Sequence, residues 1–390
     1  MKKDGKIIDL DKRRRKLNYK KILSALKIPV VILAVIAALI LSARLVGKVA
    51  MSNVTDSLRQ IKTIFSKGQG FPYGIEDEDV LRVEAIGNRI LVLGEDSSLV
   101  LDGKAGELLR FQLTNAKSKV ASFNGRALIY SNGSQNVVMQ SKTEQLGSIK
   151  EDGAVITAAI SKNGWFATTY ASEGKHSVLT VYNNEFEKEF IWQCANERIN
   201  AIALSPDGKK VAVSAMGVEN AEIYSRLMIF NTKESAPVYD AKINSTLFLK
   251  LYFTSKETVI AVGDNKTLAI GKDGEKKNEI VYSENSFSLS AADEKGNVAV
   301  CCSEFGGTRS LITVFRKDGS TACSITVQGE PSALDIGSNK VAVAVGGELM
   351  VYNFKGAEKK RFQTSTNAEQ VMICSGKFFT VEDGKICRYK

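Results

Sequence analysis

The chain has 390 residues and a formal net charge of +10, which would fit a nucleic-acid partner if the charge were spread along the chain. Residues 1–27, however, hold 11 Lys or Arg and 3 Asp or Glu, so they contribute +8 and the other residues only +2. That near-neutral remainder offers no general attraction for a polyanion, and we expect no nucleic-acid partner.

The N-terminal residues are predicted to anchor the chain in a membrane. Residues 1–22 form a basic tail, and Ile28–Ala43 run for sixteen residues without a charge. A bilayer-spanning helix needs about 20 mainly apolar residues, so residues 23–46 are predicted to be one transmembrane helix. The positive-inside rule places the tail in the cytoplasm and the rest outside, in a single-pass protein of the cell membrane.

The same apolar run could instead be a buried core helix or a cleaved signal peptide. A core helix would have a polar stripe, but apolar residues cover every face of this one. The sequence LSA at Leu41–Ala43 resembles a cleavage site, yet the basic region of 27 residues and the long apolar run exceed the usual dimensions of a signal peptide. We therefore favour a retained anchor.

Residues 47–69 are predicted to be a juxtamembrane stalk. Val54, Leu58, Ile61 and Phe65 recur at near-helical spacing, which indicates a short amphipathic helix that ends before the glycines that follow. This helix could pack against the neighbouring domain, against the bilayer surface or against a second copy.

Residues 70–390 contain a repeated hairpin. One copy, INAIALSPDGKKVAVSA at Ile199–Ala215, is an alternating apolar run, a tight polar turn and a second run rich in Val and Ala. A third and usually a fourth strand follow each hairpin, and four strands per repeat are typical of a propeller blade. The turns recur about every forty residues, near Gly87, Gly125, Gly164, Gly208, Lys256, Gly296, Ser338 and Gly376.

These repeats predict an all-β fold, an eight-bladed β-propeller. A four-stranded meander cannot bury both faces alone, whereas blades stacked in a ring cover one another. The last unit ends at KICRYK without a fourth strand, and we expect GFPYGIE at Gly70–Glu76 to supply it and close the ring. A seven-bladed ring is the alternative, if the irregular unit around FTSKETVIAVGD merges with a neighbour.

Two stretches resemble known propeller repeats. LSPDGKKVAVSA is similar to hairpins of WD40-like, YVTN-type and TolB-type repeats, and LVLDGKAGELLRF to the turn of quinoprotein-like and BamB-like blades. The sequence lacks the Gly-His and Trp-Asp signatures of WD40 repeats, and Leu109 and Arg110 stand where the quinoprotein tryptophan is expected. The whole arrangement resembles a domain-of-unknown-function family of Gram-positive bacterial membrane-anchored propellers, a resemblance that implies no activity.

The sequence offers few residues for catalysis or metal binding. Its single histidine, His176, lies in a predicted hairpin turn with no nucleophile or carboxylate positioned to use it. The acidic run Glu76–Asp79 lacks the spaced ligands and the glycine of a calcium loop, and Asp264 and Asp273 fall in separate turns. We predict no catalytic residue, no metal site and no cofactor.

The cysteines and large aromatic residues are predicted to serve packing. Trp165 and Trp192 are expected to pack within blades, whereas Tyr224 lies in GVENAEIYSR, which could form a protruding loop. The cysteines lack metal or redox spacing, so we expect packed free thiols, with one or two disulfides as the alternative. They are Cys194, Cys301, Cys302, Cys323, Cys374 and Cys387.

Together these features predict a membrane-tethered, extracytoplasmic propeller that binds or scaffolds an envelope protein or polymer, with the bilayer as second partner through residues 23–46. We do not expect an enzyme, because the innermost strands offer mostly Ala, Val, Ile and Ser. The alternative is a quinoprotein-like dehydrogenase or a hydrolase that uses a central funnel. A transmembrane sensor is disfavoured, because 27 cytoplasmic residues hold no signalling domain.

Overall fold

The computed structural model describes residue 56 and residues 68–75, 80–114, 117–172, 174–255, 258–283 and 285–390. The predicted tail at residues 1–22 and the predicted membrane helix at residues 23–46 lie outside these ranges, as does most of the predicted stalk at residues 47–69. Within the ranges, we find no helix with the length and apolar content needed to cross a bilayer.

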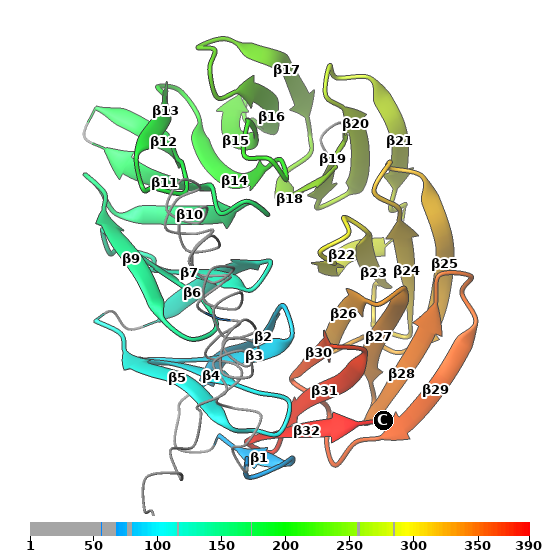
Figure 1. The fold of residues 1–390 in the computed structure, drawn as a ribbon. Helices are drawn as coiled ribbons and strands as arrows, with labels where there is room; N and C mark the ends of the chain where they lie inside the picture. The colour runs from blue at the N-terminus through cyan, green and yellow to red at the C-terminus, as the bar shows by residue number, and fades with distance from the viewer. Residues whose placement is uncertain are drawn as a thin grey trace, which may run out of the picture. The chain divides into compact units, whose positions relative to one another are not determined.

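The described residues form 32 β-strands in eight four-stranded antiparallel sheets arranged in a ring. Each sheet is one blade, and in Figure 1 the first strand of each blade lies nearest the centre of the ring. The predicted all-β, eight-bladed propeller is confirmed. The unit around FTSKETVIAVGD forms a sheet of its own, so the seven-bladed alternative is wrong.

We number the blades 1 to 8 from the first full sheet. In blades 1 to 7 the strands follow one another outward from the axis in chain order, and in blade 8 the first strand of the chain is the outermost. The innermost strands are β2 (Val80–Ile86), β6 (Ser118–Phe123), β10 (Val155–Ile160), β14 (Arg198–Leu204), β18 (Phe248–Ser255), β22 (Asn285–Ala292), β26 (Ala333–Gly337) and β30 (Gln370–Cys374). The second strands are β3 (Arg89–Gly94), β7 (Arg126–Ser131), β11 (Phe166–Ser172), β15 (Lys210–Glu219), β19 (Thr258–Gly263), β23 (Val298–Glu304), β27 (Lys340–Val345) and β31 (Lys377–Glu382).

The outer half of each blade completes the meander. The third strands are β4 (Ser97–Leu101), β8 (Asn136–Gln140), β12 (Lys175–Tyr182), β16 (Glu222–Asn231), β20 (Lys266–Gly271), β24 (Arg309–Phe315), β28 (Glu348–Asn353) and β32 (Lys385–Tyr389). The fourth strands are β5 (Glu107–Gln112), β9 (Gln145–Lys150), β13 (Lys188–Cys194), β17 (Pro237–Asn244), β21 (Lys276–Val281), β25 (Thr321–Gln328), β29 (Glu358–Gln363) and, in blade 8, β1 (Tyr73–Gly74).

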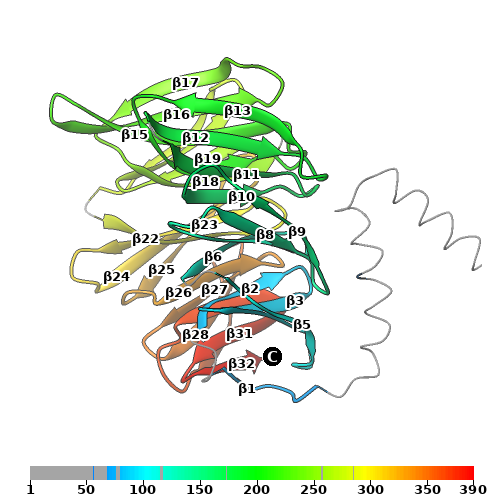
Figure 2. The same ribbon diagram turned by 90° about the vertical axis from the view of Figure 1, so that its left-hand side faces the viewer.

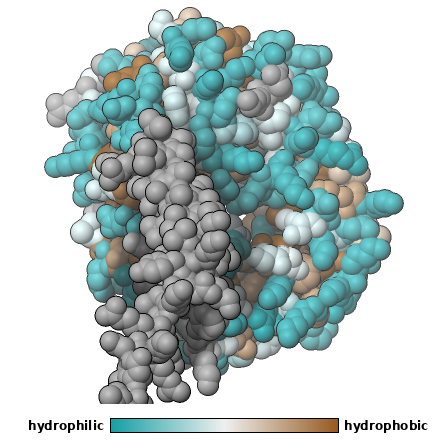
Figure 3. Space-filling model, in the orientation of Figure 1, coloured by the Kyte–Doolittle hydropathy of each residue, from teal (hydrophilic) through white to brown (hydrophobic). Residues whose placement is uncertain are grey.

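Burial follows this radial order. Second strands such as β7 and β19 are buried along their whole length, because neighbouring blades cover both of their faces. Fourth strands such as β17 alternate between half-buried and exposed residues, because they lie at the rim. The face of the propeller seen in Figure 3 is mostly hydrophilic, with apolar residues scattered over it.

The apolar core lies between the blades. The described residues form eight clusters of buried apolar side chains, and each cluster joins two neighbouring blades. In one of them, Leu128 and Tyr130 of blade 2 pack with Phe166 and Tyr182 of blade 3. The rings of Phe166 and Tyr182 stack with their centroids 4.8 Å apart. A blade therefore has no core of its own and depends on both neighbours.

The strand β1 closes the ring by completing blade 8. Tyr73 pairs with Ile386, and Gly74 with Lys385, along the outer edge of β32. The Tyr73 hydroxyl also donates to Glu107 Oε1 of blade 1 at 3.1 Å. The pairing confirms the closure predicted for Gly70–Glu76.

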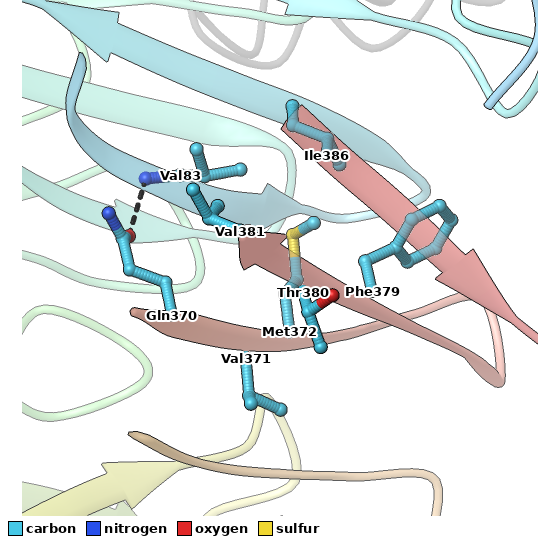
Figure 4. A pocket seen from close by; sticks show the side chains of 8 residues that line it. All are labelled: Val83, Gln370, Val371, Met372, Phe379, Thr380, Val381 and Ile386. Carbon is cyan, nitrogen blue, oxygen red and sulfur yellow. Dashed lines mark hydrogen bonds between the residues drawn. The ribbon is translucent and has the colours of Figure 1, made fainter. Parts of the chain in front are cut away.

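The interface between blades 8 and 1 is shown in Figure 4. The Val83 backbone N–H donates to Gln370 Oε1 at 2.8 Å, beside the apolar side chains of Met372, Val381 and Ile386. This hydrogen bond and the apolar contact, together with the bond from Tyr73 to Glu107, thus join the two blades that are farthest apart in the sequence.

The hairpin at Ile199–Ala215 forms β14, a tight turn and β15. Ser205 Oγ donates to Asp207 Oδ1 at 2.7 Å, and the Gly208 N–H donates to the Ser205 carbonyl at 2.8 Å. Gly208 has a φ of +72°, and a Cβ there would lie 2.5 Å from Trp165 Cγ. This turn therefore requires glycine both for its backbone conformation and for the indole that covers it.

Candidate functional site

Charged side chains from four innermost strands gather around the propeller axis. They are Arg82 and Glu84 on β2, Lys119 on β6, Lys250 on β18 and Asp335 on β26, and we call these five residues the axial site. The charges of Arg82 and Glu84 act on both Lys250 and Asp335, so residues from blades 1, 5 and 7 lie within electrostatic reach of one another.

The three cations lie at a similar level along the axis. Arg82 and Lys119 each precede the last residue of their strand by four positions, and Lys250 does so by five. All three are exposed to solvent. Although its side chain reaches solvent, the surrounding inner strands partly desolvate Lys250, and this desolvation, with the charges of Arg82 and Lys119, lowers its pKa. Lys250 forms no hydrogen bond or ion pair with any residue that the structure describes.

The two carboxyl groups bond to neighbouring blades. Glu84 accepts hydrogen bonds from Ser122 Oγ of blade 2 at 2.8 Å and from Arg82 Nε at 3.1 Å. Asp335 Oδ2 accepts the backbone N–H of Ile373 in blade 8 at 2.6 Å. Burial raises the pKa of Asp335 to about 7, although this hydrogen bond opposes the rise. Near neutral pH the Asp335 carboxyl is therefore about half protonated.

Uncharged side chains make similar links around the axis. The Tyr252 hydroxyl and Ser290 Oγ lie 2.8 Å apart and join blades 5 and 6. Asn200 Nδ2 donates to the Phe248 carbonyl at 2.5 Å and joins blades 4 and 5. These polar residues of the inner strands thus hold blades together, whereas Lys250 has no such role within the described residues.

One end of the axis is bridged by a contact between opposite blades. The backbone N–H of Asn124, in the turn between β6 and β7, donates to Glu294 Oε1, in the turn between β22 and β23, at 3.2 Å. Blades 2 and 6 face each other across an eight-bladed ring, so this contact crosses the axis. The exposed cations lie nearer the other end, where the innermost strands begin.

Residue 56 contacts the propeller at the bridged end. Asp56 Oδ1 accepts hydrogen bonds from Ser141 Oγ at 2.9 Å and Thr143 Oγ1 at 2.5 Å, in the turn between β8 and β9. Strands alternate in direction, so this turn lies at the same end as the turn that holds Asn124. Asp56 is 2% exposed. Burial lowers the pKa of Arg126, and the charge of Asp56 opposes this, so residue 56 docks on blade 2.

The acidic and histidine candidates from the sequence do not come together. His176 lies in β12 rather than in a turn, because the turn ends at Gly174; the structure does not describe its side chain. Asp264 accepts the Leu247 N–H at 3.0 Å, and Asp273 lies in a different turn. Glu76–Asp79 fall outside the described residues. The part of the chain that the structure describes holds no group of three or more His, Cys, Asp or Glu side chains suited to a metal ion.

The two tryptophans pack between blades, as predicted. Trp165 lies against the core between blades 3 and 4 and covers Gly208. The Trp192 ring lies 5.0 Å from the Phe230 ring, centroid to centroid, in the same cluster. Neither indole contributes to the axial site.

Tyr224 lies on a long hairpin rather than on the loop that the sequence suggested. The strands β15 and β16 have ten residues each and continue to Glu219 and Glu222, and Figure 2 shows this hairpin reaching beyond the neighbouring blades. The Tyr224 ring covers Gly217, where a Cβ would lie 2.3 Å from Cζ, and Lys242 Nζ lies 4.2 Å from the ring centroid. The close ring contact supports β pairing up to the tip.

All six cysteines are free thiols, and four of them are buried. Burial raises the pKa of Cys301 and of Cys302 to about 12, and that of Cys194 and of Cys374 to about 11. Such thiols are weak nucleophiles at neutral pH and pack as small apolar groups.

The sequence analysis missed the axial site. The innermost strands were expected to carry mostly Ala, Val, Ile and Ser. That expectation overlooked five charged residues on these strands, namely Arg82, Glu84, Lys119, Lys250 and Asp335. The available signal was the presence of charged positions within each apolar run, as in LRVEAI, SKVASF, FLKLYF and ALDIG. Such a residue in an inner strand must face either a neighbouring blade or the axis.

The sequence matches the profile of a family described as "Family of unknown function (DUF5711)" over residues 72–390. No curated protein sequence matches the chain. Among solved structures, Sqt1 of Saccharomyces cerevisiae is similar at 11% identity and a TM-score of 0.56, over 82% of this chain and 98% of that one.

Two bacterial structures have the same fold. BamB of Moraxella catarrhalis is similar at 11% identity and a TM-score of 0.52, over 83% of this chain and 99% of that one. Apo AztD of Citrobacter koseri is similar at 11% identity and a TM-score of 0.52, over 75% of this chain and 88% of that one. At these identities the similarity shows the propeller fold alone.

Proposed function

The chain belongs to this family of unknown function, and we propose that its propeller is a non-catalytic binding or scaffolding module held outside the cell membrane. The proposal rests on the axial site. Charged side chains from four innermost strands lie around the axis, the three cations among them are exposed, and Lys250 has no described partner that would explain it as a link between blades. Charge placed without a structural partner is typical of a binding surface.

The tether is inferred from the sequence. Residues 23–46 are long and apolar enough for one transmembrane helix, and the cationic excess of residues 1–22 favours a cytoplasmic tail. Residue 56 docks at the bridged end of the axis and the exposed cations lie nearer the opposite end, where a partner from the envelope would bind. That partner is a protein or a polymer of the envelope.

One observation favours an enzyme as the second candidate. The pKa of Asp335, raised by burial to about 7, lies in the range useful for a general acid or base. We prefer binding, because Asp335 Oδ2 already accepts the Ile373 N–H at 2.6 Å and thereby joins blades 7 and 8. An enzyme would lose turnover in D335N, whereas a binding module would keep its partner.

Site-specific crosslinking in intact cells tests the proposal. A photoreactive residue placed at position 250 should crosslink a discrete envelope component, whereas the same residue at exposed position 359 on β29 should not. Protease treatment of whole cells should remove the propeller and spare the N-terminal tail. Equal crosslinking from both positions would refute the axial site as the binding surface, and a protected propeller with a digested tail would refute the orientation.

A further inference from the structure

We propose that the axial site binds the carboxylate or phosphate group of a small anionic ligand. This inference names the ligand class of the site and rests on the proposed binding function. Arg82, Lys119 and Lys250 bring three positive charges to the axis, against the two carboxyl groups of Glu84 and Asp335.

The two carboxyl groups at the axis already accept hydrogen bonds from other groups. Glu84 lies 3.1 Å from Arg82 Nε and also accepts the Ser122 hydroxyl, so one cation and one anion balance each other. Burial holds the pKa of Asp335 at about 7, so this carboxyl supplies only part of a negative charge near neutral pH. Lys119 and Lys250 therefore leave a positive surplus, which also contributes to the lowered pKa of Lys250.

An anion would relieve this repulsion. An oxyanion accepts several hydrogen bonds at once, and charge-assisted bonds from ammonium and guanidinium groups are among the strongest in proteins. Such a ligand can reach the cations, because Arg82, Lys119 and Lys250 are all exposed. The uncharged hydroxyls of Tyr252 and Ser290 lie on the same innermost strands, in β18 and β22, and can accept or donate to the rest of a ligand.

The direction of approach follows from the fold. The contact between Asn124 and Glu294 crosses the axis at one end, and Asp56 docks at that same end. A ligand therefore enters from the opposite end, where the innermost strands begin and the cations are exposed.

Calorimetric titration of the full chain in a mild detergent, at low ionic strength and pH 7, tests the proposal. Inorganic phosphate and succinate are titrated separately, so the result also shows which oxyanion is preferred. We expect saturable one-site binding of at least one of them. Lys250→Met should weaken this binding at least five-fold, because it removes one of the surplus charges and breaks no described contact.

Two further variants sharpen the test. Asp335→Asn keeps an oxygen that can accept the Ile373 N–H but removes the titrating charge, so it should tighten anion binding. Lys359→Met removes an exposed lysine from the rim strand β29 and should leave binding unchanged. Thermal unfolding of each variant checks that the propeller is intact.

The outcomes separate this inference from the function beneath it. No saturable binding of either anion, unchanged binding in Lys250→Met, or an equal loss in Lys359→Met would overturn the anionic ligand class. If the anions did not bind but position 250 still crosslinked a partner in cells, the proposed binding function would be retained with a ligand of another class. If an anion bound but no partner were crosslinked, the anion site would be supported and the proposal of an envelope partner would be refuted.

Discussion

Replacing Glu382 with glutamine should destabilise the propeller strongly, although the two side chains have the same shape. Glu382 ends β31 and is 1% exposed. Its carboxylate accepts the N–H and the hydroxyl of Ser365 at 2.6 and 2.8 Å, the Thr380 hydroxyl at 2.5 Å and the Tyr389 hydroxyl at 2.7 Å. Burial opposes the ionised form, but these four hydrogen bonds outweigh it and lower the pKa of Glu382 to about 2.

The magnitude follows from that pKa. A pKa about 2.5 below that of a free glutamate corresponds to about 3 kcal/mol of stability at neutral pH. A glutamine places an NH2 group against at least one of the four donors, so E382Q should lose about 2 to 3 kcal/mol. The lost hydrogen bonds are those to Ser365, in the linker between blades 7 and 8, and those to Thr380 and Tyr389, in the sheet of blade 8 that closes the ring.

The pH dependence has a definite sign. Because the folded pKa of Glu382 is lowered, its contribution is complete above the pKa of a free glutamate and is lost as the pH falls towards about 2. The gap in stability between the native chain and E382Q should therefore shrink between pH 5 and pH 2. Urea unfolding of the full chain in mild detergent, followed by the fluorescence of Trp165 and Trp192, measures this gap.

Glu358→Gln is the matched control. Glu358 bonds to Arg361 at the exposed rim strand β29, and solvent screens such a pair so that it contributes little to stability. If E382Q and E358Q unfolded at the same urea concentration at pH 7, the reasoning about the buried carboxylate would be refuted.

Three further predictions concern the ring, a turn and the axis. Tyr73→Ala should lower the free energy of urea unfolding by about 3 kcal/mol, because it leaves a cavity where the buried ring packs beside β32. Tyr73→Phe removes only the hydrogen bond to Glu107 and should lower it by about 1 kcal/mol; equal effects would show that the ring's packing does not stabilise the closure. Gly208→Ala should lower the midpoint of thermal unfolding more than Gly133→Ala does. Both glycines have a positive φ, but only at Gly208 would the added methyl group meet the Trp165 ring; equal shifts would show that the ring can move aside without loss of stability. Asp335 faces Glu84 and Arg82 and has a raised pKa, so its contribution to stability is complete below the pKa of a free aspartate and is lost as the pH rises through about 7. The stability of Asp335→Asn relative to the native chain should therefore increase between about pH 4 and pH 7 and stay level above that; a constant difference over this range would refute the reasoning.

The repeat pattern was enough to predict the blades, because each is a local meander. Hairpins such as Ile199–Ala215 contain their own turn chemistry, and the period near forty carries through even where the turn at Lys256 lacks a glycine. The closing strand was predictable as well, since KICRYK leaves blade 8 one strand short.

The axial site was not predictable in the same way. Arg82 and Lys250 are 168 positions apart in the sequence, and only the closed ring brings their charges within reach of each other. The sequence of a single innermost strand does not indicate which of its side chains point towards the propeller axis. The stretch GVENAEIYSR was expected to form a protruding loop, but it continues the hairpin, and the Tyr224 ring covers Gly217 from across the strand pair.

The pairing of β1 with β32 has a consequence for the order in which the molecule can be made. During synthesis β1 is among the first propeller residues to emerge, whereas Lys385, the partner of Gly74, follows 311 residues later. Until then the growing ring is an open arc whose two end blades expose the apolar faces that later meet, including Val83 on one side and Val381 on the other. Such an arc can take a first strand from another nascent copy as readily as its own, so crowded translation should favour strand-exchanged oligomers.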